Sequence, residues 1–278
     1  MVTILTVYLT VVFCLSAIIR EVPAQSENDN GICSRMYIRN GPQELSRLEN
    51  CRVIEGSLQI ALANGSTDQW KNFSFPLREI TGYLLLYDAR GLQSLRHIFP
   101  NLTVIRGQEF IHNNYALLVN DMPDMQEIGL PSLTNILNGK VWIYNNQNLC
   151  YLETIDWGKI TNGTQGNGIK KNKPSEQCPN TCPLKSCPKS DQGLSLCWSN
   201  EDCQKVQVKT CPEDCDGQNC EDCCSDQCLG GCTGPGPRDC FVCKHVEYNG
   251  LCMSNCPAGT YMYLKTHYQQ FFLLFHKH

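Results

Sequence analysis

The sequence is poor in charge and has no long basic run. Charged residues make up 18% of the 278 residues, and the formal net charge is −4. Proteins that bind nucleic acid need a basic patch or stripe, so no nucleic-acid partner is expected. Hydrophobic residues account for 42% of the chain. That share argues against disorder, which needs low hydrophobicity and high net charge.

Residues and motifs typical of enzymes are also scarce. There are six histidines, and three of them lie in the segment 261–278. The nearest approaches to phosphate-binding loops are Gly166-Asn167-Gly168 and Gly234-Pro235-Gly236. Neither continues into the pattern that such a loop needs between a strand and a helix. No local signature of a nucleophile is present either. We therefore expect no catalytic residue and no cofactor.

Long apolar runs are limited to the N-terminus. Residues 4–19 are uncharged and apolar, and Val22-Pro23-Ala24 follows soon after. Small residues at positions 22 and 24 predict cleavage after Ala24, so residues 1–24 are interpreted as a signal peptide. An uncleaved membrane anchor is the alternative, although the run is short for a span. The later run 271–275 is far too short to span a bilayer, so no membrane span is expected in this chain.

Cysteine, in contrast, is abundant. The chain has 20 cysteines, of which sixteen lie between Cys178 and Cys256. Such density indicates either a disulfide scaffold or metal sites, and Cys240-x-x-Cys243 followed by His245 could suggest zinc. Four glycosylation sequons agree with export to an oxidising compartment, where thiols form disulfides. The sequons begin at Asn64, Asn72, Asn101 and Asn162. We therefore predict disulfides and no metal.

One phrase recurs in the part of the chain with few cysteines. Its clearest copies are 75–82 and 99–107, with a looser copy at 130–139 and an opening copy without proline at 51–56. Each copy ends in a glycine, at positions 56, 82, 107 and 139, and a run typical of a β-strand follows. These runs are 57–60, 83–87, 115–119 and 141–144. Repeats at this spacing predict a solenoid with parallel strands, and an ordinary β-sandwich is the alternative.

The ends of this predicted solenoid carry cysteines. A short helical segment is expected around Pro42 to Glu49, with Cys33 and Cys51 on either side, and a bridge between them would cap the core. At the far end Cys150 has its natural partner in Cys178, across a polar loop. This stretch, 161–178, is predicted to be the linker between two domains.

Beyond the linker, residues 179–260 contain few large aliphatic side chains. Such a region cannot bury enough apolar surface to fold by packing alone, so each disulfide would contribute about 2–4 kcal/mol by restricting the unfolded chain. The prediction is a disulfide-rich rod of small units. The tail 261–278 has no cysteine and departs from this pattern. We interpret it as the product of a truncated reading frame, and a β-prone, sticky tail is the alternative.

Several longer phrases resemble the insulin receptor and insulin-like growth factor receptor family. They are 48–60, 99–107, 114–117 and 149–157, together with Cys197-Trp198, Cys203-Gln204-Lys205 and 223–230. The resemblance covers roughly residues 31–260. It implies a right-handed parallel β-helix, the receptor L domain, over 31–160, and an incomplete furin-like cysteine-rich region over 179–260. The epidermal growth factor receptor family shares the architecture but matches these phrases less well.

The resemblance also implies a disulfide pairing that spacing alone leaves open. The implied pairs are Cys33–Cys51, Cys150–Cys178, Cys182–Cys197, Cys187–Cys203, Cys211–Cys220, Cys215–Cys223, Cys224–Cys232, Cys228–Cys240 and Cys243–Cys252. Cys14 lies in the predicted signal peptide, which leaves Cys256 unpaired.

In the family, peptide hormone lies across the broad sheet face of the first L domain. The positions that match this surface are Arg39, Asn40, Gln59, Leu62, Tyr87, Tyr115 and Leu118. Without the resemblance these would be ordinary rung residues on a solvated face. Family aromatics are replaced by Asn64, by the stretch 112–113 and by Asn120, and a family basic position is Trp142. A glycan at Asn64 would obstruct the face.

The resemblance implies an extracellular or secreted fragment that binds an insulin-like peptide hormone without any covalent step. Family members are receptor tyrosine kinases, but the membrane span and kinase are expected to be absent from this chain. It would then be a receptor cut short or a soluble decoy that sequesters hormone or pairs with other receptor chains. The alternative is a cysteine-rich extracellular protein with a structural or inhibitory role that has lost hormone binding.

Overall fold

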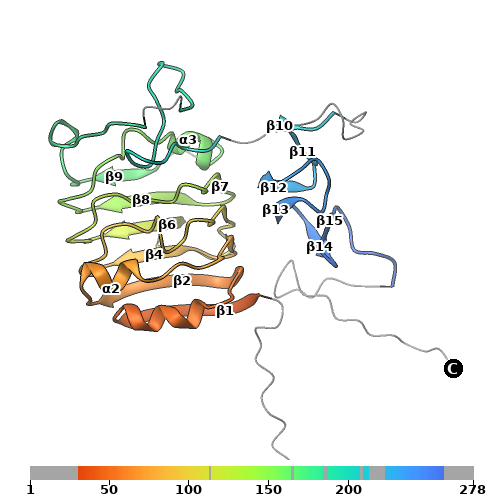
Figure 1. The fold of residues 1–278 in the computed structure, drawn as a ribbon, viewed down its shortest axis with the longest axis horizontal. Coiled ribbons are helices and arrows are strands. Elements are labelled where there is room, and N and C mark those ends of the chain that lie inside the picture. Colours follow the sequence, from red (N-terminus) through yellow and green to blue (C-terminus); the bar gives the residue numbers. More distant parts are fainter. Residues whose placement is uncertain are drawn as a thin grey trace, which may run out of the picture.

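The computed structural model describes residues 31–112, 114–163, 166–183, 187–206, 209–212 and 223–259. The predicted signal peptide and the tail 261–278 lie outside these residues. The described chain forms a stack of parallel β-rungs, and a smaller segment with short strands lies alongside it (Figure 1).

The stack is one nine-stranded parallel sheet that folds around a core. Its strands are β1 (Ile32–Asn40), β2 (Val53–Ala63), β3 (Glu79–Ile80), β4 (Leu84–Tyr87), β5 (Val104–Ile105), β6 (Tyr115–Asn120), β7 (Asn135–Ile136), β8 (Lys140–Tyr144) and β9 (Gly168–Lys170). The start of β2 pairs with β3 and its later part with β4, so the sheet has two branches. We call β1, β2, β4, β6, β8 and β9 the broad branch, and β3, β5 and β7 the narrow branch. The predicted parallel solenoid is confirmed.

The repeated phrase makes the corner between the branches. In the three later copies, a two-residue strand (β3, β5 or β7) lies just before the glycine and belongs to the narrow branch. After the glycine, the chain continues into the next strand of the broad branch. Gly107 has φ of 62°, and its N–H donates to the carbonyl oxygen of Gly82 at 3.0 Å. A Cβ on Gly107 would lie 2.0 Å from the carbonyl oxygen of Asn138. Only glycine tolerates both this conformation and this close approach.

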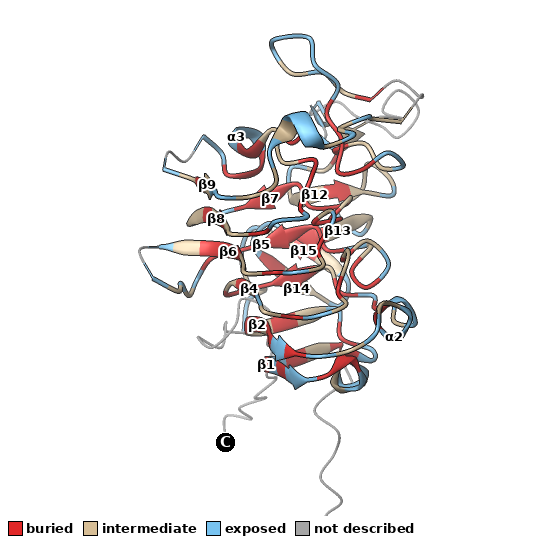
Figure 2. Ribbon diagram, turned by 90° about the vertical axis from the view of Figure 1, so that its left-hand side faces the viewer, coloured by how far each residue is buried: buried red, intermediate tan, exposed pale blue. Residues whose placement is uncertain are grey.

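The core consists of aligned aliphatic rows from the broad branch. Leu58, Leu84, Leu117 and Val141 lie in register on neighbouring strands, and all four are 0% exposed. Successive side chains of a strand point to opposite faces, so the residues between these rows face outward. Figure 2 shows the buried positions recurring from rung to rung inside the stack.

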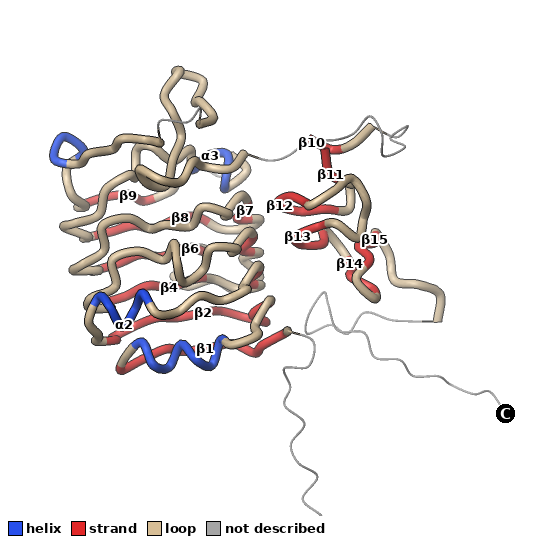
Figure 3. The backbone as a smooth tube through the Cα atoms, viewed as in Figure 1, coloured by secondary structure: helices blue, strands red, loops and turns tan. Residues whose placement is uncertain are grey.

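Short helices lie at the ends and along one side of the stack (Figure 3). They are η1 (Pro42–Leu48), α2 (Thr67–Lys71), α3 (Trp157–Ile160) and η2 (Ser175–Gln177). The 3-10 helix η1 confirms the short helical segment expected before the first repeat. Its Leu45 and Leu48 are fully buried, and the disulfide Cys33–Cys51 closes the same end of the core.

Part of the predicted linker belongs to the sheet. Gly168–Lys170 forms β9, which pairs with β8 as the last strand of the broad branch. Just beyond it, the Asn172 side-chain amide donates to the carbonyl oxygen of Ile143 at 3.0 Å. The polar stretch 161–178 therefore contains one more rung of the solenoid. Its composition did not predict a strand, because backbone hydrogen bonds and an asparagine side chain can hold a strand without apolar residues.

The cysteine-rich segment contains β10 (Lys209–Thr210), β11 (Cys223–Cys224), β12 (Cys228–Cys232), β13 (Cys240–Cys243), β14 (Val246–Tyr248) and β15 (Leu251–Met253). Eight disulfides are present among the described residues. Seven are pairs that the resemblance implied: Cys33–Cys51, Cys150–Cys178, Cys182–Cys197, Cys187–Cys203, Cys224–Cys232, Cys228–Cys240 and Cys243–Cys252. Cys256 has no disulfide partner in this part of the chain.

The eighth disulfide corrects the prediction. Cys211 pairs with Cys223, with 4.9 Å between the Cα atoms, so the pairs Cys211–Cys220 and Cys215–Cys223 are wrong. The physical reason is the parallel pairing of β10 with β11, in which the Cys211 N–H donates to the carbonyl oxygen of Cys224 at 2.8 Å. This ladder brings Cys211 beside Cys223. Cys215 and Cys220 lie outside the described residues.

The cysteine-rich segment packs against the solenoid. Arg106, which follows β5, donates to the carbonyl oxygen of Cys243 at 2.7 Å. Trp198 is 0% exposed within the solenoid core, where its ring meets Trp157 edge-on at 5.7 Å. The cysteine-rich segment, for which composition predicted a rod, therefore contacts the solenoid beside the narrow branch and near its last rung.

Two further properties concern only the residues that the structure describes. None of their helices is long and apolar enough to cross a bilayer. These residues also contain no cluster of three or more histidine, cysteine, aspartate or glutamate side chains arranged to hold a metal ion.

Candidate docking face of the sheet

The outward side chains of the broad branch form two rows that cross the strands. The first row is Tyr37, Gln59, Leu85, Leu118 and Trp142, and the second is Ala61, Tyr87, Asn120, Tyr144 and Lys170. Both rows follow from the in-register parallel pairing, which stacks equivalent positions of successive rungs. We call the surface formed by these two rows the docking face.

The structure brings three of the seven sequence-predicted contact residues into these rows. Gln59 and Leu118 belong to the first row and Tyr87 to the second. Tyr87 is 40% exposed, whereas Leu118 is only 3% exposed. Leu118 is therefore covered by its neighbours, and it supports the face from below without offering much surface to a partner.

The remaining predicted residues lie around the rows. Arg39, Asn40 and Leu62 are exposed where β1 and β2 end, and we call this part of the docking face, together with Tyr87, the edge. Leu62 is 58% exposed and has φ of 55°, which turns its side chain toward solvent. Tyr115 begins β6 beside the first row.

An aromatic cluster occupies the half of the docking face formed by β6 and β8. The rings of Tyr115 and Trp142 are 5.2 Å apart, and those of Trp142 and Tyr144 are stacked at 5.7 Å. The Lys171 ammonium lies 5.2 Å from the centre of the Tyr144 ring. Trp142 also covers Gly168, where a Cβ would lie 2.1 Å from the indole ring. Sequence reasoning missed this cluster, because it treated Trp142 only as a departure from a basic position.

A signal for the cluster is present in the sequence. Val141 to Tyr144 alternates aliphatic and aromatic residues, and in the structure the aliphatic ones are buried while the aromatic ones face outward. Because side chains alternate between the two sides of a strand, this pattern predicts that Trp142 and Tyr144 lie on the outer side. Leu85 and Tyr37 follow from the same rule.

Internal contacts hold the polar side chains near β1 and β2 in place. The Gln59 side chain donates to the Tyr83 hydroxyl at 2.5 Å, and the Ser57 hydroxyl donates to Glu109 at 2.9 Å. Glu109 also forms an ion pair with Arg35. Burial, as the largest cause, raises the pKa of Tyr83, so its hydroxyl remains protonated. These contacts pre-organise the face, which reduces the entropy lost on binding.

Asn120 occupies the middle of the second row between Tyr87 and Tyr144. Its side-chain oxygen Oδ1 is buried and accepts no hydrogen bond from the residues that the structure describes. The other positions singled out as replacements are more peripheral. Asn64 is exposed just after β2, and His112 lies in the loop before β6 with φ of 37°. Asn113 lies outside the described residues.

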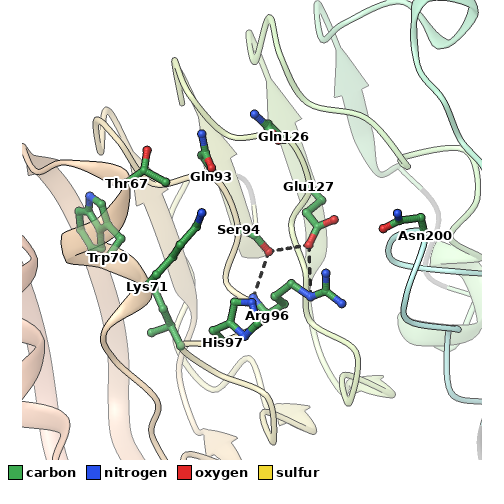
Figure 4. A pocket seen from close by; sticks show the side chains of 11 residues that line it. Thr67, Trp70, Lys71, Gln93, Ser94, Arg96, His97, Gln126, Glu127 and Asn200 are labelled. Atoms are coloured by element: carbon green, nitrogen blue, oxygen red, sulfur yellow. Dashed lines mark hydrogen bonds and ion pairs between the residues drawn. The ribbon is translucent and has the colours of Figure 1, made fainter.

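A polar pocket of about 290 Å³ has no residue of the two outward rows in its lining (Figure 4). Its lining residues are Thr67, Trp70, Lys71, Gln93, Ser94, Arg96, His97, Ile98, Gln126, Glu127 and Asn200. Ser94 donates to Glu127 at 2.8 Å, and Arg96 bridges Glu127 in the solenoid to Asp202 beyond it. Arg96 and Glu127 therefore bind each other, which indicates a structural junction.

Comparisons with known proteins agree with this architecture. The family model for the receptor L domain matches residues 50–161, and that for the furin-like cysteine-rich region matches residues 168–270. The chain therefore contains a receptor L domain followed by a furin-like cysteine-rich region.

Individual relatives define the class more closely. An insulin-like peptide receptor of Branchiostoma lanceolatum is 47% identical over 86% of this chain and 18% of the receptor. The insulin-like growth factor 1 receptor of Xenopus laevis is 43% identical over 82% of this chain and 18% of that receptor. The insulin receptor of the same species is 42% identical over 85% and 18%, respectively. Over this region the chain belongs to the insulin and insulin-like growth factor receptor family.

The chain thus spans about a fifth of the length of these relatives, and it corresponds to the N-terminal part of their ectodomains.

Proposed function

We propose that this chain binds an insulin-like peptide hormone on the docking face. The relatives that it matches include receptors named for insulin-like peptides, insulin and insulin-like growth factor 1. The observation that carries the proposal is the aromatic cluster on the broad branch, in which Trp142 and Tyr144 belong to the outward rows and Tyr115 lies beside them. Aromatic anchors surrounded by polar groups are typical of the energetic centre of a protein interface.

The mechanism is non-covalent capture on a preformed surface. The rings supply apolar area for desolvated contact, and Gln59, Asn120 and Arg39 offer hydrogen-bonding groups around them. A face built on stacked strands changes little on binding, which favours affinity.

The proposed setting is extracellular. Eight disulfides among the described residues are typical of proteins that fold in an oxidising compartment. Secretion through the signal peptide 1–24 would deliver the chain there, with glycans at the four sequons, whose asparagines are all exposed. In this setting the chain sequesters hormone as a soluble decoy or pairs with other receptor chains.

Binding of a purified insulin-like peptide, measured by titration calorimetry on the secreted full chain, tests this function. Trp142→Ala should weaken binding by about 30-fold or more, since a central aromatic anchor typically contributes at least 2 kcal/mol. Leu194→Ala is the matched control, because Leu194 is an apolar side chain, 61% exposed, in the cysteine-rich segment. It should leave affinity unchanged.

Equal affinity of Trp142→Ala and the unaltered chain would contradict the assignment of the docking face. If the folded, fully bridged chain bound no insulin-like peptide, the alternative would hold: a cysteine-rich extracellular protein with a structural or inhibitory role.

A further inference from the structure

One sequon lies next to the edge of the docking face. Asn64 directly follows β2 and is exposed, and its N–H donates to the carbonyl oxygen of Asn40 at 2.9 Å. On its other side it forms an isolated bridge with Arg90 in the next rung. Asn64 is therefore held at the edge by its neighbours in the rungs on both sides.

The residues around Asn64 are predicted contact residues. Asn40 pairs with Ala63, next to Asn64, and Tyr87 pairs with Ala61. Asn64 is three residues after Ala61, the partner of Tyr87 on β2. Three residues of extended strand span about 10 Å, so Asn64 lies within about 10 Å of Ala61 along the chain. Leu62, two positions away, is 58% exposed. A bulky group on the Asn64 side chain would stand among Asn40, Leu62 and Tyr87.

The local structure leaves this asparagine accessible. Asn64 is exposed in the short connection between β2 and α2. Ser66, the third sequon residue, caps α2 with its own hydroxyl, which accepts from the Gln69 N–H at 3.4 Å. The sequon therefore lies at the surface of a short structured turn, and any glycan it carries projects from the edge.

We propose that Asn64 carries an N-linked glycan that covers the edge and lowers the affinity of the docking face for its partner. This inference rests on the proposed function for the identity of the partner. The aromatic cluster lies on β6 and β8, which are the second and third strands beyond β2 in the sheet order. The glycan therefore attenuates binding and does not abolish it, because the aromatic half stays open.

The test compares the secreted full chain with Asn64→Gln and with Asn101→Gln. Asn101→Gln is the matched control, since Asn101 is an exposed sequon asparagine that precedes the narrow branch and lies outside both outward rows. Peptide mapping by mass spectrometry should find a glycan at Asn64. Asn64→Gln retains Ser66 and hence the cap of α2, so the turn is preserved. An insulin-like peptide should bind Asn64→Gln at least about tenfold more tightly, and Asn101→Gln with unchanged affinity.

A second probe makes the result independent of the hormone. A nanobody is selected on the Asn64→Gln protein and retained only if Tyr87→Ala abolishes its binding. It should bind the glycosylated chain at least about tenfold more weakly than it binds Asn64→Gln. An unoccupied Asn64, or equal nanobody binding to both forms, would overturn the inference. So would a peptide that binds both forms equally.

If the nanobody distinguishes the two forms while neither binds any insulin-like peptide, the proposed function fails and the covering of the edge by the glycan stands. The two ideas therefore fail by different results.

Discussion

The most deeply buried charges with a partner are Glu79 and Arg106, on the narrow branch. Their ion pair is 2.5 Å long, with side chains 1% and 6% exposed. Arg106 also donates to the carbonyl oxygen of Cys243, so one side chain holds the cysteine-rich segment and neutralises a buried carboxylate. A sequence cannot reveal such a pair, because Glu79 and Arg106 belong to different repeats and meet only when the rungs stack.

We predict that Arg106→Ala destabilises the chain by about 3–5 kcal/mol, because it leaves the Glu79 carboxylate buried without its cation. Urea unfolding measures the change in the free energy of unfolding. The control is Arg35→Ala, since Arg35 and its partner Glu109 are 46% and 39% exposed. An exposed pair contributes about 0–1 kcal/mol. Equal losses from the two substitutions would contradict the role of burial.

Glu127 gives a prediction about pH. Burial, the largest cause, raises the pKa of Glu127, while the Ser94 hydrogen bond and Arg96 oppose the shift. The folded state therefore retains this proton at a pH where the unfolded state, with a pKa near 4.5, has lost it. Stability that depends on Glu127 is greatest below pH 4.5 and falls as pH rises through the folded pKa.

Glu127→Gln should remove this dependence, so its curve of unfolding free energy against pH should fall less steeply above pH 4.5. Urea titrations at several pH values measure the two curves. Glu153→Gln, which removes an exposed carboxylate, is the control. Its unfolding free energy should change with pH as steeply as that of the unaltered chain. A slope that Glu127→Gln does not change would show that the carboxyl group is not responsible.

At the scale of elements, the repeated phrase was enough to predict the rungs. The glycines and the apolar runs after them predicted β2, β4, β6 and β8, because backbone geometry and a period-two pattern are local properties. The polar segment that forms β9 was missed, since its backbone bonds to β8 leave no mark in composition. The Cys211–Cys223 pair was missed for a similar reason: it depends on strand pairing and not on spacing.

Substituting the corner glycine Gly107 tests the solenoid geometry. The φ of 62° alone should cost about 1–2 kcal/mol in Gly107→Ala, and the contact with the Asn138 oxygen should add about 1–3 kcal/mol. Gly163→Ala is the matched control, because Gly163 has φ of 75° but no atom within 4 Å of its added Cβ. Thermal unfolding should show the larger loss for Gly107→Ala. Equal losses would mean that the corner is loosely packed.

At the scale of the whole molecule, the cysteine-rich segment contacts the narrow branch, and the proposed docking face lies on the broad branch. The cysteine-rich segment contacts the narrow-branch side of the solenoid at two arginines. Arg106 donates to the carbonyl oxygen of Cys243, and the Arg78 guanidinium lies 5.6 Å from the centre of the Phe241 ring. The outward rows of the broad branch carry the aromatic cluster and remain open. The sequence predicted the sheet that bears the docking face and three residues of its rows. The alternation in β8 is visible in the sequence, but the contact of Trp142 with Tyr115 depends on how neighbouring rungs align.

The most direct test of the account is to map where a bound peptide lies on the folded chain. An insulin-like peptide carrying a photoreactive group is crosslinked to the secreted full chain, and the linked residues are identified by mass spectrometry. The account predicts crosslinks on the docking face, on strands β4, β6 and β8 near Tyr87, Tyr115 and Trp142. Crosslinks confined to the pocket around Glu127 or to the cysteine-rich segment would contradict it.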